Sequence, residues 1–335
     1  MNPRERIRLG RTALSVTRFG LGTAPLAGLF EEVAEDDALA VIERAWDSGI
    51  RFFDTAPLYG HGLAEIRLGK VLRNKPRQEF TLASKVGRLL RADAPPEPGQ
   101  SFRGTPPVNP TFDFSYDGVM RSVDESLARL GLDRIDILHI HDPDDHYEAA
   151  LNGAYRALDR LRSEGAIGAV GAGMNQAEML TRFAREADFD CFLLAGRYTL
   201  LDQVALKELL PECVERGIAI IAGGVYNSGI LADPRPGAHY DYQAAPAALL
   251  ERAQRIRDAC TRHHVPLKAA AEQFPLGHPA VECVVVGCRS AAQLDESIAM
   301  FEVDIPPDLW RDLKAEGLLP VQAPTPGLIV DSEPN

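Results

Sequence analysis

The sequence predicts a single-domain parallel α/β barrel of the (β/α)8, or TIM-barrel, class that spans residues 1–335. Short apolar runs rich in β-branched residues alternate with amphipathic stretches along the chain, which is the pattern of repeated βαβ units. There are about eight such runs, the number that closes a parallel barrel. A length of 335 residues also suits one barrel of about 250 residues with insertions.

The elements follow one another in the order that a barrel requires. The expected strands are residues 18–21, 50–53, 80–84, 135–140, 167–171, 191–195, 218–222 and 283–286. The expected helices are residues 36–47, 116–130, 147–162, 177–186, 205–216, 246–262 and 291–300. Several of these helices end at a glycine that follows a basic or small residue, where glycine can adopt the left-handed capping conformation.

Two segments interrupt this alternation. Residues 86–114 are rich in proline, glycine and polar residues and are too long for an ordinary connection between a strand and a helix. Because this insertion follows the third strand, it lies on the side of the barrel where loops build active sites. It is either a surface insertion or a cover for a substrate. Residues 318–335 contain several prolines and form a tail that is disordered or lies over the barrel.

Charge and composition exclude several classes of function. Acidic residues outnumber basic ones by 48 to 36, giving a net charge of −12, which argues against a nucleic-acid surface. No apolar run approaches the ~20 residues of a membrane span, and the N-terminus lacks the apolar stretch of a secretory signal, so a cytoplasmic location is expected. Five scattered cysteines without a C-x-x-C pair argue against a disulfide framework and a zinc knuckle.

Four polar residues stand at or just beyond the ends of expected strands. They are Asp54 and Tyr59 in FFDTAPLYG, Lys85 in TLASKVG and His141 in DILHIHDP. In a parallel barrel all strand ends open on one face, so these side chains can converge despite their separation in sequence.

Together the four residues suit proton transfer at an alcohol or carbonyl oxygen. A free phenol titrates near ~10, but an adjacent ammonium such as that of Lys85 favours the phenolate of Tyr59. A lysine drawn into a pocket keeps its charge when a carboxylate lies beside it, and Asp54 is available for this. His141 would hold the substrate oxygen. Each residue taken alone could have an ordinary structural role.

Electrons for such a reaction would have to come from a cofactor, yet the usual dinucleotide fingerprint is absent. The pairs Gly20-x-Gly22 and Gly171-x-Gly173 both lack the third glycine that the fingerprint requires. Late in the chain, VVVGCRSAAQLDESI places Gly287, Arg289 and Ser290 before a helix, which would suit a phosphate group. The same residues could instead form a glycine turn with a surface arginine.

Over nearly its whole length the sequence resembles the aldo-keto reductase superfamily. The resemblance is carried by IRLGRTALSVTRFGLGTAPLAG, DTAPLYGHGLAEIRLGKVL, SKVG, LDRIDILHIHDP and VVVGCRSAAQLDES. It implies an N-terminal hairpin and a barrel that binds extended NAD or NADP at its C-terminal rim without a Rossmann domain. It also implies that Tyr59 is the general acid or base, that Lys85 and Asp54 tune it, and that His141 orients the substrate. His139, one same-face step earlier, is expected to be buried packing.

The segments GAGMNQ, LLAGRYTLLDQ and IAGGVYNSGIL are similar to a branch that oxidises aldoses such as L-fucose at C1, together with pyridoxal 4-dehydrogenases. This similarity implies hydride transfer between a nicotinamide and C1 of an aldose, giving a lactone. Pyridoxal oxidation or general aldehyde and ketone reduction are the alternatives. The substrate would be a small sugar or aldehyde. The resemblance does not give an oligomeric state.

The resemblance also implies a set of cofactor contacts. They are Gly22, Thr23, Asp54, Asn175, Gly224, Val225, Tyr226, Asn227, Ser228, Gly287, Arg289, Gln293, Glu296 and Ser297. Asn175 is the candidate for holding the carboxamide, because Gly173-Met174 replaces the Ser-Asn of many relatives. Gly223 falls where many relatives have the aromatic residue that stacks on the nicotinamide, which leaves Val225 or Tyr226 to cover the ring.

Cofactor choice depends on the charge around the adenosine ribose. The lysine and arginine that many NADPH-preferring relatives use there correspond to Gly287 and Gln293. Arg289 is then the main nearby cation, and a single arginine can accept a phosphate without excluding NAD. The sequence therefore predicts NADP or NAD.

Two alternatives of other classes remain. His139 and His141, which share one face of a strand and precede Asp142, Asp144, Asp145 and His146, could bind the metal of a barrel hydrolase. That alternative would make the other three strand-end residues a coincidence, and we expect no metal. The chain could also be a non-catalytic barrel that senses NAD(P).

Overall fold

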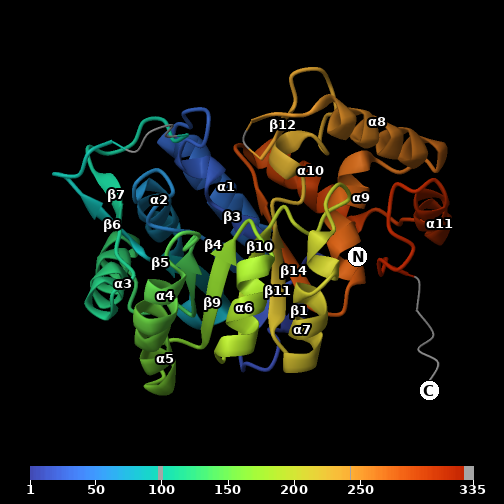
Figure 1. The fold of residues 1–335 in the computed structure, drawn as a ribbon. Helices are drawn as coiled ribbons and strands as arrows, with labels where there is room; N and C mark the ends of the chain where they lie inside the picture. Colours follow the sequence, from blue (N-terminus) through green and yellow to red (C-terminus); the bar gives the residue numbers. More distant parts are fainter. Residues whose placement is uncertain (97–100, 242, 328–335) are drawn as a thin grey trace.

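The computed structural model of the protein describes residues 1–96, 101–241 and 243–327. Within these residues, parallel strands close into an eight-stranded barrel surrounded by helices (Figure 1). In barrel order they are β3 (Phe19–Gly22), β4 (Phe52–Asp54), β5 (Thr81–Val86), β8 (Ile137–His141), β9 (Ala169–Met174), β10 (Cys191–Ala195), β11 (Ala219–Gly223) and β14 (Val281–Gly287). Pairing of β14 with β3 closes the ring, and the predicted fold is confirmed.

The helices lie on the outside of this barrel. They are α1 (Glu35–Asp47), α2 (Leu63–Leu72), α3 (Tyr116–Leu130), α4 (Tyr147–Ala149), α5 (Arg156–Ser163), α6 (Glu178–Glu186), α7 (Leu209–Arg216), α8 (Ala247–Arg262), α9 (Leu267–Gln273), α10 (Ala291–Glu302) and α11 (Pro307–Ala315). Short 3-10 turns occupy Pro25–Ala27, Arg77–Glu79, Val204–Leu206, Asn227–Gly229 and Phe274–Gly277. A π-helical segment, Ala150–Tyr155, joins α4 to α5.

All eight predicted strands are present, with ends that differ from the prediction by no more than a few residues. Three helices were not predicted, namely α2, α9 and α11. The seven residues of α9, LKAAAEQ, are mostly buried, so this helix has no polar face to reveal its period. α2 has buried polar residues and a central glycine, Gly69, where a Cβ atom would lie 2.0 Å from the carbonyl oxygen of Leu130 on α3.

An N-terminal hairpin closes one end of the barrel. Its strands are β1 (Arg6–Arg8) and β2 (Ser15–Thr17), which pair antiparallel as the resemblance implied. Leu9 and Val16 join the cluster of side chains that fills the barrel interior. Gly10 packs against Gly217 and Ala219, at the start of β11, so the hairpin covers the N-terminal ends of the strands. Functional side chains are left to the opposite end.

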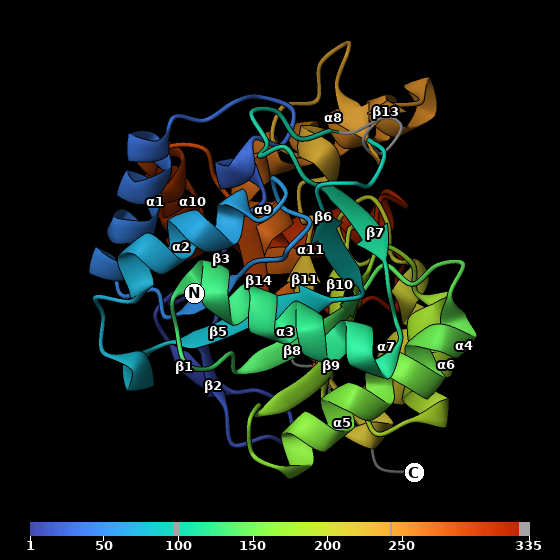
Figure 2. The same cartoon turned by 90° about the vertical axis from the view of Figure 1, so that its left-hand side faces the viewer.

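The insertion at residues 86–114 is described except for residues 97–100. Its ends form an antiparallel pair, β6 (Arg88–Arg91) and β7 (Asn109–Phe112), which Figure 2 shows above α3. Ser101 accepts a backbone hydrogen bond from Phe30 at 2.8 Å, and Leu29 and Phe102 form an isolated bridge. The insertion therefore joins the loop that follows β3, on the side where the barrel strands end.

Two further segments complete the chain. A small antiparallel pair, β12 (His239–Tyr240) and β13 (Gln243–Ala244), precedes α8. In the predicted tail, Leu318, Leu319 and Ala323 are buried against the barrel, while residues 328–335 lie outside the described part of the chain. No helix of the described residues is both long and apolar enough to cross a membrane.

The barrel interior contains one histidine with no exposed surface, as predicted. His139 lies on β8 opposite Gly171 of β9, where a Cβ atom would lie 2.2 Å from the Nδ1 atom of the imidazole ring. Neither ring nitrogen of His139 has a hydrogen-bond partner. Burial, assisted by the Lys85 ammonium, lowers the pKa of His139 to about 3. The ring is therefore neutral in the folded protein at ordinary pH.

His139 should make stability depend on pH. An unfolded histidine titrates near ~6.5, so below that pH the unfolded chain binds a proton that the folded chain does not. Stability is then lost as the pH falls from about 6.5 toward about 3. We expect His139→Asn to reduce the difference in unfolding free energy between pH 7 and pH 5 by about 2 kcal/mol. Urea denaturation at both pH values measures this difference. His239→Asn, at an exposed site on β12, should leave the difference unchanged, and an unchanged value for His139→Asn would contradict the expectation.

Candidate active site

The structure brings the four predicted strand-end residues together. Asp54 is the last residue of β4, Lys85 lies near the end of β5, and His141 ends β8. The Lys85 ammonium donates to both Asp54 carboxylate oxygens at 2.8 Å and to the Thr55 carbonyl at 2.9 Å. The Lys85 Nζ atom lies 4.7 Å from the centroid of the Tyr59 ring. The rings of Tyr59 and His141 meet edge to face, with centroids 5.8 Å apart.

The ion pair between Lys85 and Asp54 is almost wholly buried, with side chains 1% and 4% exposed. Burial raises the pKa of the Asp54 carboxyl, and the Lys85 ammonium opposes that rise. Thr23, which was predicted to contact the cofactor, donates its hydroxyl to the Asp54 carbonyl at 3.0 Å. It thereby holds the end of β4 in place.

Tyr59 is positioned by a tight loop between β4 and α2. Gly60 and Gly62 both adopt positive φ, which glycine tolerates best. A Cβ atom at Gly60 would lie 2.5 Å from the Ala27 carbonyl, so only glycine allows the loop to approach the 3-10 turn after β3. The centroid of the Tyr59 ring lies 6.1 Å from the centroid of the Phe102 ring, which belongs to the insertion.

His141 is a neutral group in this site. Burial lowers the pKa of His141 well below its usual value, and the charges of Lys85 and Arg88 and the neighbouring His139 lower it further. A neutral imidazole has one nitrogen that can donate and one that can accept. His141 can therefore hold a substrate oxygen without adding charge.

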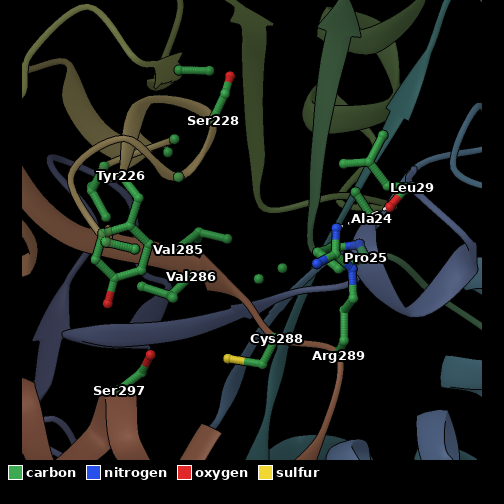
Figure 3. Close-up of a pocket in the computed structure, with 18 of the residues that line it drawn as sticks. Ala24, Pro25, Leu29, Tyr226, Ser228, Val285, Val286, Cys288, Arg289 and Ser297 are labelled. Atoms are coloured by element: carbon green, nitrogen blue, oxygen red, sulfur yellow. Dashed lines mark hydrogen bonds between the residues drawn. The ribbon is translucent and has the colours of Figure 1, made fainter. Parts of the chain in front are cut away.

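A cavity of about 460 Å³, lined at one end by Asp54 and Tyr59, reaches the N-terminus of α10 (Figure 3). Predicted cofactor contacts that line it are Gly22, Asp54, Gly224, Val225, Tyr226, Asn227, Ser228, Gly287, Arg289, Gln293, Glu296 and Ser297. Asn175 is exposed and, like Thr23, does not line this cavity, because it lies beyond the end of β9. A role for Asn175 in holding the carboxamide stays a prediction.

Glycines give the cavity its shape. Gly22 and Gly287 end the neighbouring strands β3 and β14, and a Cβ atom at Gly287 would lie 2.6 Å from Pro25. Gly224, at φ +60°, packs against Gly196, where a Cβ atom would lie 3.0 Å from the backbone nitrogen. The backbone can therefore approach a ligand closely along this wall.

The polar end of the cavity lies at the start of α10. Ser290 caps this helix by accepting a hydrogen bond from the Gln293 backbone at 3.2 Å, and the Gln293 side chain accepts one from the Arg289 backbone at 2.9 Å. The Arg289 guanidinium donates to the Leu29 carbonyl at 3.2 Å while lining the cavity. Lys268 is a second cation in the lining. Two cations and a helix N-terminus suit a phosphate-bearing ligand.

The sequence did not predict Lys268 as a residue of the cavity, because it did not predict helix α9. Its ammonium lies 2.8 Å from the Glu296 carboxylate, and both residues line the cavity. Arg289 is therefore not the only lysine or arginine in the described lining. No local sequence signal marks Lys268, whose place depends on the packing of α9 against α10. Sequence reasoning also missed Ala24, Pro25, Leu29, Phe30 and Cys288 of the lining.

The loop after β11 forms the wall opposite Arg289 in Figure 3. Asn227 and Ser228 adopt positive φ, a costly conformation for residues other than glycine that is common at functional sites. The Asn227 side chain anchors the loop by accepting from the Thr199 hydroxyl at 2.6 Å and donating to the Gly196 carbonyl at 3.1 Å. Val225 and Tyr226 both line the cavity. That one of them covers the nicotinamide ring stays a prediction.

Tyr226 is held by a buried acid. Its hydroxyl donates to Glu272 of α9, which has no exposed surface. Burial raises the pKa of Glu272 to about 8, while its hydrogen bonds oppose the rise. The same partnership fixes the orientation of the Tyr226 ring at the cavity wall.

The cavity fits the dinucleotide that the sequence resemblance implied. It combines glycine-lined backbone, apolar side chains such as Val285 and Val286, two cations at one end and the Tyr59 group at the other. Within residues 1–96, 101–241 and 243–327, no three His, Cys, Asp or Glu side chains are grouped so that they could hold a metal ion. Nothing in this part of the chain therefore favours the alternative of a metal hydrolase built on His139 and His141.

Comparisons with known proteins agree with this geometry. A model of the Aldo/keto reductase family matches residues 18–316. The chain is 46% identical to pyridoxal 4-dehydrogenase of Microbacterium luteolum, covering 94% of this chain and 98% of that protein. It is 44% identical to D-threo-aldose 1-dehydrogenase of a Pseudomonas species (92% and 96%) and 31% identical to L-galactose dehydrogenase of Arabidopsis thaliana (87% and 86%).

Solved structures share the fold at lower identity. An aldo-keto reductase of Bacillus halodurans in its holo form superimposes with a TM-score of 0.74 at 23% identity, covering 93% of this chain and 95% of that one. Glycerol dehydrogenase of Gluconobacter oxydans gives a TM-score of 0.72 at 21% identity, covering 97% and 99%. The family match covers residues 18–316, a range that contains all eight barrel strands and the positions of the four strand-end residues. The chain therefore belongs to the aldo/keto reductase family and is an NAD(P)-dependent oxidoreductase.

Proposed function

We propose that the protein oxidises the cyclic form of an aldose at C1 to the lactone, with NAD or NADP as oxidant. The observation that carries this proposal is the Lys85 ammonium, held by Asp54 and 4.7 Å from the Tyr59 ring centroid at one end of the cavity. Two relatives that act on aldoses by name, D-threo-aldose 1-dehydrogenase and L-galactose dehydrogenase, support the choice of substrate.

Each of the four strand-end residues has a distinct role in this reaction. A bound dinucleotide would supply the nicotinamide as the hydride acceptor for C1. Tyr59, as the phenolate, takes the proton from the anomeric hydroxyl, and in the reverse direction it returns that proton as an acid. The Lys85 ammonium stabilises the phenolate, and Asp54 holds that ammonium in place with two hydrogen bonds. Neutral His141 holds the substrate oxygen beside Tyr59.

Cofactor contacts are proposed for the cavity wall. The residues that would hold the dinucleotide are Gly22, Gly224, Arg289, Gln293 and Ser297, with Lys268 added to the set. Arg289 and Lys268 supply positive charge, but Glu296 pairs with Lys268, so neither NAD nor NADP is favoured. The cytoplasmic location expected from the sequence stays a prediction.

Pyridoxal is the second candidate substrate, favoured by the 46% identity to pyridoxal 4-dehydrogenase. The neighbouring hydroxymethyl group of pyridoxal can close on its aldehyde to form a hemiacetal. An aldose and pyridoxal then present the same reacting group, a hemiacetal hydroxyl on a carbon that bears a hydrogen. The proposed chemistry at Tyr59 is the same for both.

A spectrophotometric screen at 340 nm tests this function. We expect reduction of NAD or NADP with L-fucose, related aldoses or pyridoxal, because each can form a hemiacetal. A primary alcohol without a hemiacetal, such as 1-butanol, should react far more slowly. Equal rates with 1-butanol and with the aldoses would contradict oxidation at a hemiacetal carbon. Tight cofactor binding without any turnover would instead favour the NAD(P)-sensing alternative.

Tyr59→Phe removes the proton acceptor while keeping the ring. We expect kcat to fall by about 100-fold to 10,000-fold, the usual value of a general acid or base. Cofactor affinity, followed by quenching of protein fluorescence, should change little. Tyr116→Phe, at an exposed site on α3, is the matched control and should behave like the unmodified protein. A Tyr59→Phe variant with near-normal turnover would mean that another group carries the proton.

Lys85→Met should move the pH profile of oxidation. Without the ammonium, the Tyr59 phenolate is less stable, so the rise in kcat/KM should occur at higher pH, by about one unit or more. Asp54→Asn should shift the profile in the same direction by a smaller amount, because Lys85 then loses its carboxylate partner. Rates measured from pH 6 to pH 10.5 report the shift. Profiles that keep the original midpoint would remove Lys85 from the proton-transfer step.

A further inference from the structure

A second pair of charged residues lies beside His141 and has no role in the proton transfer described above. The Asp142 carboxylate lies 3.5 Å from the His141 Nε2 atom, and an Arg88 guanidinium nitrogen lies 3.7 Å from the same carboxylate oxygen. The Arg88 side chain is 11% exposed and that of Asp142 is 34% exposed. The pair therefore borders the site and is accessible to a ligand on the Asp142 side.

Both members of the pair are fixed in position, Arg88 by its packing and Asp142 by its backbone. Arg88 is the first residue of β6, at the base of the insertion hairpin, and its guanidinium stacks on Phe112 of β7 with 4.3 Å from Cζ to the ring centroid. Phe112 in turn packs against Phe114 and His146. Asp142 adopts φ +42°, and its backbone nitrogen donates to the Gly173 carbonyl at 3.0 Å. A strained backbone at a non-glycine residue is frequent where a side chain has a functional position.

The chemistry of the pair limits the substrates that it can accept. Arg88 offers only donors and Asp142 only acceptors, so a hydroxyl group, which is both, can bond to either. The two charges cancel, so the pair gives little net attraction to a phosphate or carboxylate group. An apolar aldehyde would displace water from both charges and return no hydrogen bond, which costs binding free energy.

We propose that Arg88 and Asp142 determine substrate specificity by binding the hydroxyl group on the carbon next to the reacting one, and so select neutral polyhydroxylated substrates. This assignment rests on the proposed aldose oxidation. The position of the pair next to His141, which holds the reacting oxygen, places it within reach of the neighbouring carbon. Phe102, whose ring lies 6.1 Å from that of Tyr59, offers an apolar surface to the C–H face of a sugar.

The test compares matched substrates and matched variants of the full-length protein with its cofactor present. L-fucose and 2-deoxy-L-fucose differ only in the hydroxyl at issue. For Arg88→Met and Asp142→Asn, we expect kcat/KM with L-fucose to fall by about 10-fold to 100-fold, the effect of losing a hydrogen bond to a charged group. The same variants should lose less than about 3-fold with 2-deoxy-L-fucose.

Two control variants each remove a charge of the same sign from a nearby position. Arg91→Met takes a guanidinium from the same strand, where Arg91 pairs with Glu125 of α3, and Asp145→Asn changes an exposed residue three positions beyond Asp142. Both should retain unmodified kcat/KM for both sugars. If Arg88→Met lowers kcat/KM equally for L-fucose and for 2-deoxy-L-fucose, the specificity proposal is overturned and aldose oxidation is unaffected. A preference of the unmodified protein for erythrose 4-phosphate over erythrose would also overturn it.

A binding measurement separates this proposal from the proposed function. Isothermal titration calorimetry measures the affinity for L-fucose without turnover. It is applied to Tyr59→Phe and to Tyr59→Phe/Arg88→Met, both loaded with cofactor. We expect weaker binding by at least 10-fold in the double variant. If the unmodified protein fails to oxidise L-fucose but Tyr59→Phe binds it in this Arg88-dependent way, the proposed aldose oxidation is wrong, while the binding of a sugar hydroxyl by Arg88 is upheld. Equal affinities in the two variants overturn the assignment.

Discussion

The buried ion pair of Lys85 and Asp54 is the interaction on which the rest of the site depends. Two charges that are almost fully removed from water carry a large desolvation cost, and only close, complete pairing offsets it. The pairing is complete here because Lys85 donates to both Asp54 oxygens and to the Thr55 carbonyl. A barrel allows this arrangement, because adjacent parallel strands bring the ends of β4 and β5 side by side. The cation is thereby held under the Tyr59 ring without help from solvent.

Small residues inside the barrel make room for these polar groups. Gly173 on β9 faces Lys85, where a Cβ atom would lie 3.5 Å from the lysine Cε atom, and Gly171 faces His139. Larger side chains there would fill the interior with apolar packing, as Phe52 and Ile137 do in the layer nearer the N-terminal hairpin. The two ends of the barrel therefore differ in kind. One end is a packed core that stabilises the fold, and the other is the polar pocket in which Lys85, Asp54 and Tyr59 meet.

The proposed chemistry and the proposed specificity come from different parts of the chain. Asp54, Lys85 and His141 lie on barrel strands, whose geometry is shared by all proteins of this fold. Arg88, Phe102 and Phe112 belong to the insertion after β5, and the loop after β11 forms one wall of the cavity. Loops can change without disturbing the barrel, so substrate choice can change while the proton-transfer group stays in place. Asp142, directly after His141, is where the two parts meet.

The sequence by itself determined the strand order, the barrel and the identity of the four strand-end residues. These features are local, because a buried strand and the polar residue that follows it are neighbours in the chain. Only the tertiary structure decided that Lys268 lines the cavity, that Thr23 supports Asp54, that Asn175 lies outside the cavity lining and that Arg88 meets Asp142. Asn175 lies outside because of where β9 ends, and the other three depend on contacts between separate elements, such as α9 with α10 or the insertion with the end of β8. No periodicity or spacing within one segment encodes such contacts, because they are set by how whole elements pack.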